Sequence, residues 1–281
     1  MTRVAVVIPC FDDGATLREA VASLRSEEPH ELVVIDDGST DPGTRQVLDE
    51  LAGGGVQVIR QENAGLSAAR MAGVRATSAP YVFPLDADDL LVPGALGALA
   101  DALDREPGAK LAWGDVEIFG DFDGRVAGAR AFDAWQLTYV SEIPVASLIR
   151  RDALVEAGGW QLRGYEDWDL WMAFAERGWR GAYVGRAVIR HRQHGRRLVA
   201  SMLDSFGAVY AVLRERHRPL FEARRANWRR SEAPWRVKLL FPVIGALPGV
   251  SALDKHRLCR LVSRPHETLR GRRRRLRAVA S

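Results

Sequence analysis

Residues 81–89 read Tyr81-Val82-Phe83-Pro84-Leu85-Asp86-Ala87-Asp88-Asp89. An apolar, β-prone run that stops in acidic residues predicts a buried strand with carboxylates at its end. If the strand stays extended there, Asp86 and Asp88 point to the same side, roughly 6–7 Å apart. Two such ionised carboxylates repel by roughly 2–3 kcal/mol at an effective dielectric of about 20. A divalent cation removes that cost, so the stretch predicts a cation site, with a solvated acidic turn as the alternative.

Similar apolar runs precede this stretch at residues 4–9, 32–35 and 56–59, and segments with helical spacing separate them. Strands that alternate with helices in this way predict an α/β fold with a right-handed, mostly parallel sheet. Ligands of such sheets bind outside the carboxyl ends of the strands. Three strand ends, at residues 9–12, 36–37 and 86–89, each carry at least one Asp, which predicts a polar, cation-assisted site on one rim.

The composition is that of a globular protein of one large or two modest domains, with 281 residues and 47% hydrophobic content. Two cysteines, Cys10 and Cys259, imply no disulfide framework and favour a reducing compartment. We read Cys10 as a packing residue. The opening residues leave no room for a signal peptide, and the apolar run at 239–250 is too short to span a bilayer as a helix.

The net charge of +4 hides an asymmetry along the chain. Residues 1–213 contain 21 Lys/Arg and 31 Asp/Glu, whereas residues 214–281 contain 19 and 5. The first part therefore carries −10 and the second +14, which indicates an acidic body with a basic appendage.

Several stretches match, in order, the signatures of one family. They are Val6-Val7-Ile8-Pro9-Cys10-Phe11-Asp12, Val34-Ile35-Asp36-Asp37-Gly38-Ser39-Thr40-Asp41, Asn63-Ala64-Gly65-Leu66-Ser67-Ala68-Ala69-Arg70, Leu85-Asp86-Ala87-Asp88-Asp89, Gly158-Gly159-Trp160, Gly164-Tyr165-Glu166-Asp167-Trp168-Asp169-Leu170-Trp171 and His191-Arg192-Gln193-His194. Together they resemble the family 2 glycosyltransferases, across roughly residues 3–200.

The resemblance implies a GT-A fold, a Rossmann-like, mostly parallel central sheet with helices on both faces. It implies a catalytic domain at residues 1–200, with a nucleotide-binding half at about 1–110 and an acceptor-binding half at about 111–200. Residues 201–281 lie outside the resemblance, and we expect them to form a basic helical extension.

The resemblance also assigns the nucleotide pocket. Its members are Pro9, Phe11, Asp12, Asp37, Asn63, Arg70 and Asp86. Asp37 can accept the imide N–H of a uracil or thymine ring, whereas Asp36 can simply cap its turn. Arg70 would bring positive charge to the phosphates, the alternative being an exposed helix residue.

For the metal, the resemblance implies Asp88, with His194 as a further ligand and Mn²⁺ or Mg²⁺ as the cofactor. The alternative for His194 is a surface position in an Arg-rich loop. Trp113, Trp135 and Tyr139 can stack on a sugar, although core packing is the commoner role for such aromatic residues.

Glu166 opens a helix that is apolar almost all round, which predicts a buried helix. The resemblance places the general base at Asp167, and we expect the helix N-terminus to keep that carboxylate ionised. Glu166 would orient the acceptor or cap the helix. Asp169 faces another direction, because successive helix residues differ by about 100°, and we expect it to be structural or exposed.

The predicted reaction is metal-dependent, inverting transfer of a sugar from a UDP- or TDP-sugar to an acceptor hydroxyl, in cell-surface polysaccharide or glycolipid synthesis. A sugar nucleotidyltransferase is an alternative, but residues 9–14 contain a single Gly where its phosphate loop needs several. A non-catalytic nucleotide-sugar-binding module is the other, but it would be expected to lose Asp88 or Asp167.

The extension mixes cations with aromatic and aliphatic residues, as interfacial membrane anchors do. We expect a cytoplasmic protein whose extension, with the Arg272–Arg275 cluster, binds the anionic inner face of the plasma membrane. A solvated tail is the alternative. Such charge would also suit nucleic acid, but we expect none as a partner.

Overall fold

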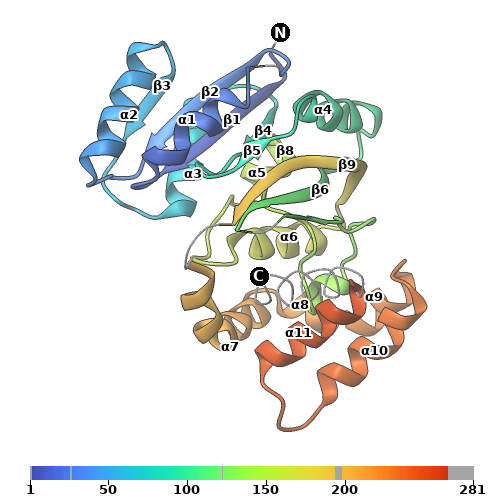
Figure 1. Cartoon of the computed structure of the whole chain (residues 1–281). Coiled ribbons are helices and arrows are strands. Elements are labelled where there is room, and N and C mark those ends of the chain that lie inside the picture. Colours follow the sequence, from blue (N-terminus) through green and yellow to red (C-terminus); the bar gives the residue numbers. More distant parts are fainter. Residues whose placement is uncertain (1, 26, 122, 194–197, 265–281) are drawn as a thin grey trace.

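The computed structural model describes residues 2–25, 27–121, 123–193 and 198–264, and the side chains of 198–204 are not described. In these ranges the chain forms an α/β body built on a nine-stranded sheet, with a group of helices below it (Figure 1). No helix in the described ranges is both long enough and apolar enough to cross a membrane.

The first part of the sheet is parallel and follows the predicted alternation. Its strands, in spatial order, are β3 (Gln57–Arg60), β2 (His30–Asp36), β1 (Val4–Cys10) and β4 (Tyr81–Pro84). The helices between them are α1 (Gly14–Ala22), α2 (Pro42–Gly53) and α3 (Leu66–Ala76). Pro42 lies in the first turn of α2, where its missing N–H costs nothing.

The second part of the sheet is mixed. It contains β5 (Leu90–Leu91), β6 (Ala109–Gly120), β7 (Gly124–Val126), β8 (Leu148–Arg150) and β9 (Arg180–Gln193). β6 and β9 pair in parallel, whereas β8, β5 and β7 run antiparallel to their neighbours. This part also holds α4 (Ala95–Arg105), a 3₁₀ turn η1 (Gln136–Thr138), α5 (Arg151–Glu156) and α6 (Glu166–Glu176).

Helices cover both faces of the sheet, as predicted, because the central strands are apolar on both sides. In β1, the side chains of Val4, Val6 and Ile8 pack in one core with α1 and α4, and Val7 packs in the other with α3 and α6. This period of two is the signature of a strand buried on both faces. Gly73 of α3 lies against Val7 so closely that a Cβ would be 2.2 Å from a Val7 methyl group.

The acidic stretch departs from the expected extended strand. β4 ends at Pro84, and residues 86–89 form a turn in which the Asp89 amide donates to the Asp86 carbonyl oxygen at 3.1 Å. The expectation that Asp86 and Asp88 lie side by side on an extended strand was therefore wrong. In a turn the side chains no longer alternate between two faces as they do in a strand, and a local backbone hydrogen bond closes the turn.

The C-terminal extension is helical, as predicted. It consists of α7 (Leu198–Arg216), α8 (Arg218–Glu222), α9 (Arg224–Arg230), α10 (Trp235–Ala246) and α11 (Ala252–Ser263). Phe206, Leu213 and Leu220 join the same core as α6, so the extension packs against the α/β body. A solvated tail is therefore the wrong description of residues 205–264, and Arg272–Arg275 lie outside the described residues. A domain boundary at residue 200 stays a prediction.

Candidate active site

The ends of β1 and β2 are joined by hydrogen bonds that shape one side of the site. Asp12 has a left-handed backbone, with φ at 57°, and its carboxylate accepts the amide hydrogens of Thr40 and Asp41 at 2.7 and 2.8 Å. The Asp41 amide is the main reason that the pKa of Asp12 is lowered. Beside it Pro9 is buried and the ring of Phe11 is 45% exposed.

Asp37 is buried and already bonded within the protein. Its carboxylate accepts Gln61 Nε2 at 2.7 Å and the amides of Ala64 and Gly65 at 2.9 and 2.8 Å. It thus fixes the loop that carries the exposed Asn63 into α3. A carboxylate has about four acceptor positions, so room for one base N–H remains, and contact with a nucleotide stays a prediction.

Asp36 is buried and caps its own turn, as predicted. Its Oδ1 accepts the Ser39 amide at 2.8 Å.

Arg70 is the buried centre of the site, and the alternative of an exposed helix residue was wrong. Its side chain is 1% exposed and donates to Asp86 at 2.7 Å and to Glu166 at 2.8 Å. Burial opposes the charge, but the two carboxylates outweigh it and raise the pKa of Arg70. Among the described residues Arg70 Nε has no hydrogen-bond partner, and Arg70 Cζ lies 5.7 Å from the centre of the Trp160 ring.

This ion pair joins the two halves of the body. Asp86 follows β4 in the first, parallel part of the sheet and Glu166 opens α6 beside the second part, yet both bind one guanidinium. Sequence reasoning missed the link. The available signal was that Glu166, at the start of a buried helix, needs a cation.

In the acidic turn, Asp89 is buried and Asp88 is half-buried. Asp89 lies 2.9 Å from His191 Nδ1 and accepts the Arg192 amide at 3.0 Å. Burial raises the pKa of Asp89, against the pull of His191. These bonds hold the turn against the end of β9. Asp89 belongs to the acidic strand end that predicted the site, but its pairing with His191 was not predicted.

The predicted metal ligands are placed only in part. Asp88 lies in the turn, and Arg192 Nε donates to its backbone oxygen at 3.0 Å, but His194 lies outside the described residues. In the described ranges no three His, Cys, Asp or Glu side chains gather as a metal cage. Mg²⁺ typically takes one or two carboxylates and substrate phosphates, and a half-buried Asp88 fits that donor set.

The helix α6 is buried as predicted, and its three acids differ in environment. Loss of water around Asp167, followed by the charge of Glu166, raises the pKa of Asp167 to about 7. The expectation that the helix N-terminus keeps Asp167 firmly ionised was therefore wrong, because burial outweighs the backbone N–H groups. Tyr165, the residue before the helix, has φ at 62°.

Asp169 is structural, which was one of its two predicted roles. It is buried and binds Arg216 at 2.8 Å and His217 at 3.0 Å, so it ties α6 to the end of α7.

Trp113 and Trp135 are buried in the cores, which confirms their packing role, and Tyr139 is half-buried. Burial raises the pKa of the Cys10 thiol to about 11, in line with its role in packing.

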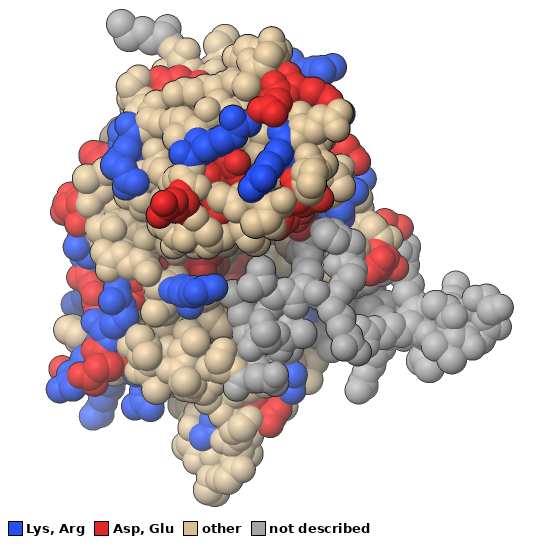
Figure 2. Space-filling view, turned by 90° about the vertical axis from the view of Figure 1, so that its left-hand side faces the viewer, with Lys and Arg blue, Asp and Glu red and all other residues tan. Residues whose placement is uncertain are grey.

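Acidic side chains line the recess beneath the upper lobe of the face in Figure 2, at the level where strands and α6 meet. Carboxylates in a recess, half-buried and close to a fixed cation, can accept a proton and attract a divalent ion.

Comparisons with known proteins identify the family and the fold. Residues 5–157 match the family model of Glycosyl transferase family 2. The succinoglycan biosynthesis protein ExoU of Rhizobium meliloti is 41% identical over 101 residues, which is 35% of this chain and 30% of ExoU. The poly(ribitol-phosphate) β-N-acetylglucosaminyltransferase TarP of Staphylococcus aureus is 33% identical over 102 residues, 34% of this chain and 31% of TarP. This chain thus spans less than a third of these relatives.

Among solved structures, S. aureus TarS 1–349 in complex with UDP-GlcNAc superposes with a TM-score of 0.59 and 16% identity. The match covers 94% of this chain and 87% of that one. At this identity the likeness concerns the fold, and it confirms the GT-A architecture.

Proposed function

This chain belongs to glycosyl transferase family 2, and on that basis we propose that it transfers a sugar, with inversion, from a nucleotide-diphosphate sugar to an acceptor hydroxyl. One observation carries the proposal. Buried Arg70 holds the acidic turn at Asp86 and the start of α6 at Glu166, so a donor-side carboxylate group and a candidate base share one site.

For the donor we propose a UDP- or TDP-sugar bound along the ends of β1 and β2. Phe11 is exposed there and can cover a base, and Asp37 has acceptor capacity left for a ring N–H. A structural neighbour that holds UDP-GlcNAc supports a uridine nucleotide.

For the metal we propose Mg²⁺ or Mn²⁺ at Asp88, with His194 as a further ligand. Such an ion, when bound, supplies positive charge that stabilises the leaving nucleotide diphosphate. We assign Asp86 to the ribose side of the site and not to the metal, and its ion pair with Arg70 supports this choice.

For the proton we propose Asp167 as general base. Its carboxylate takes the proton of the acceptor hydroxyl as that oxygen bonds to the anomeric carbon. A pKa of about 7 suits this role, because the group is basic enough to accept a proton and still ionised in part at neutral pH. Glu166, held by Arg70, fixes the start of the helix that presents Asp167.

For the acceptor we propose a glycan or glycolipid of cell-surface polysaccharide synthesis, in line with the names of ExoU and TarP. We also propose that the basic extension associates with an anionic membrane surface on the cytoplasmic side. Each Lys or Arg near such a surface contributes about 1 kcal/mol.

Release of UDP or TDP from a panel of sugar nucleotides, with Mn²⁺ or with excess chelator, tests the proposal. We expect metal-dependent release that Asp88→Asn reduces at least about 10²-fold, whereas Asp152→Asn, an exposed carboxylate far from the turn, matches the wild type. Full activity in excess chelator would contradict the proposed metal dependence. If no donor released its nucleotide, the proposed transferase activity would be contradicted.

A further inference from the structure

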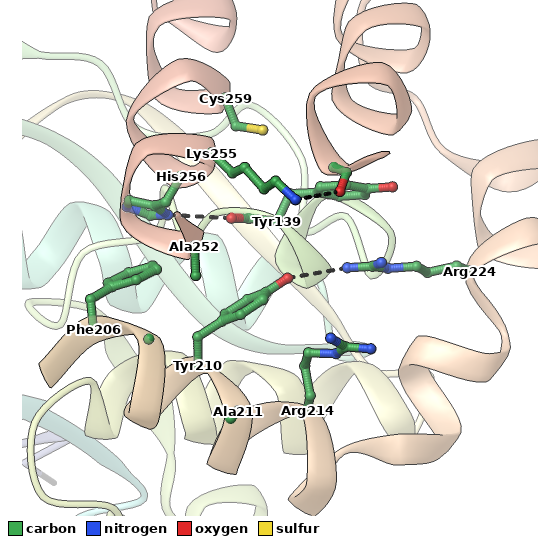
Figure 3. Close-up of a pocket in the computed structure, with 12 residues that line it drawn as sticks. Tyr139, Phe206, Tyr210, Ala211, Arg214, Arg224, Ala252, Lys255, His256 and Cys259 are labelled. Carbon is green, nitrogen blue, oxygen red and sulfur yellow. Dashed lines mark hydrogen bonds between the residues drawn. The ribbon is translucent and has the colours of Figure 1, made fainter. Parts of the chain in front are cut away.

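A pocket lies on the extension side of the molecule, away from the acidic turn. It has a volume of about 360 Å³ and lies between α7, α10 and α11, with Tyr139 of the body at one wall. Tyr210 and Phe206 of α7 and His256 of α11 supply further ring walls (Figure 3). A volume of this size suits a small ligand or the head of a larger one.

Three cations line this pocket, and no carboxylate does. They are Arg214, Arg224 and Lys255. Figure 3 shows Lys255 extending from α11 and the two arginines entering from α7 and from the side of α9. In the described part of the chain none of the three forms an ion pair. Three uncompensated cations around one cavity attract an anion.

Neutral groups hold these cations in place. Arg224 donates to Thr138 Oγ1 at 2.8 Å and to Tyr210 Oη at 3.2 Å, and Lys255 donates to the Gly245 carbonyl oxygen at 3.0 Å. Arg214 lies 5.7 Å from the ring of Phe221. The site is thus built before any anion arrives, which lowers the entropic cost of binding.

An apolar groove adjoins the pocket. It has a volume of about 610 Å³, and the two share Tyr139 and Arg224, whose ring and guanidinium lie 4.4 Å apart. Trp228, Trp235 and Leu239 line the groove, and the side chains of Trp235 and Leu239 are 78% and 59% exposed. Exposed tryptophan beside aliphatic and basic residues is typical of surfaces that enter a lipid interface.

We propose that this paired site binds one phosphate-bearing lipid, with the phosphate in the cationic pocket and the hydrocarbon chain along the groove of α10. A second copy of this chain is the poorer occupant, because residues 224–264 carry 10 Lys/Arg and 2 Asp/Glu and two such faces repel. The inference deepens the proposed membrane association and is independent of the transfer reaction.

The site also adjoins the catalytic helix. Phe206, at the pocket wall, lies 5.7 Å from the ring of Tyr165, which immediately precedes Glu166 and Asp167. A lipid held here would therefore lie next to the acceptor-binding half.

The test compares the binding of full-length variants to two forms of lipid. Calorimetry measures binding to short-chain soluble phosphatidic acid. Sedimentation measures binding to phosphatidylcholine vesicles with or without phosphatidic acid. The pocket variant is Arg214→Gln with Lys255→Gln. Its matched control is Arg218→Gln with Arg257→Gln, which removes the same charge from exposed positions on neighbouring turns. We expect the pocket variant to lose roughly tenfold in affinity per cation, for both lipid forms, and the control to lose far less.

Equal losses in the two variants would show diffuse surface attraction and overturn the site. Inorganic phosphate that binds as tightly as the soluble lipid would overturn the groove, as would an unchanged affinity in Leu239→Ser. Nucleotide release is measured in every variant. Lipid binding without any sugar-nucleotide turnover would refute the proposed reaction and leave the lipid site standing. Turnover without lipid binding would refute the lipid site and leave the proposed reaction standing.

Discussion

Asp167 lies at the start of α6, in an environment that changes the pKa of its carboxyl group. Burial raises its pKa to about 7, and Arg70 opposes that shift only in part. In the free enzyme the fraction of Asp167 that can accept a proton therefore rises as pH rises through 7. A base with this pKa is half available at neutral pH.

Replacing this carboxylate gives the prediction at the scale of one residue. Asp167→Asn should lower kcat at least about 10²-fold, because general-base catalysis typically contributes 10²–10⁴-fold. It should not lower the thermal midpoint at pH 8, since the folded wild type then holds an ionised carboxylate that burial disfavours. Glu166→Gln should be milder in kcat, because Glu166 positions the helix through Arg70.

The pH profile supplies the control. For the wild type, log(kcat/KM) should rise with a slope near one below about pH 7 and level off above it, because only the deprotonated form accepts the proton. The Asp167→Asn profile should lose this limb. A mutant that retains both the limb and near-normal turnover would place the base elsewhere.

Single residues were predictable where chemistry alone selects them. The acidic residues 86–89 stand out in the sequence as carboxylates that end an apolar run, whereas the role of Asp167 came from the family resemblance. The partners of Arg70 could not be read in the same way, because Glu166 is 96 residues away in the chain and only the closed fold brings it within 2.8 Å. The same holds for Asp89 and His191.

At the scale of elements, a buried cluster of charged side chains joins α6 to the end of α7. Asp169 binds Arg216 and His217, and His217 Nδ1 lies 3.2 Å from Glu176 at the end of the same helix. Burial favours neutral His217, but the bonds to Asp169 and Glu176 outweigh it and raise its pKa above 6.5.

The cluster predicts a pH-dependent stability. Because the folded pKa of His217 is raised, its stabilisation is fully present below the unfolded pKa, near 6.5, and is lost as pH rises through the folded value. His217→Gln should therefore lower the free energy of unfolding by about 2 kcal/mol at pH 6 and by less at pH 9. Urea unfolding at the two pH values measures this, with exposed Arg218→Gln as the control. A pH-independent difference would refute the charge argument.

The elements of residues 1–91 were largely predictable, because strands buried on both faces read as continuous apolar runs and their helices carry capping and turn signals. Residues 109–150 were not, since β6 and β8 pair with distant strands and a loop joins them. The conformation after β4 was misjudged because the same residues can form either a turn or the end of a strand. The hydrogen bond from the Asp89 amide to the Asp86 carbonyl oxygen shows that they form a turn.

At the scale of the whole molecule, the asymmetry of charge predicted a separate basic part. Apolar residues make the contacts that hold this part against the body. Phe206, Leu213 and Leu220 enter the core of α6, and Val237 and Phe241 pack with Trp135 and Val140. Composition shows that a helix is basic, whereas the identity of its partner depends on shape. The extension therefore packs against the body through apolar side chains as well as carrying charge.

The position of β9 sets an order in which the molecule can fold. It is the last strand in the chain, yet it lies between β6 and β5, and through His191 and the Val188 carbonyl it fixes Asp89 and the Val92 amide. A growing or refolding chain can form β1, β2 and β3 early, but closing a loop of about a hundred residues comes later. Pulsed hydrogen exchange during refolding should protect the amides of β1 and β2 before that of Val92. Simultaneous protection would show that the acidic turn forms without waiting for the end of the sheet.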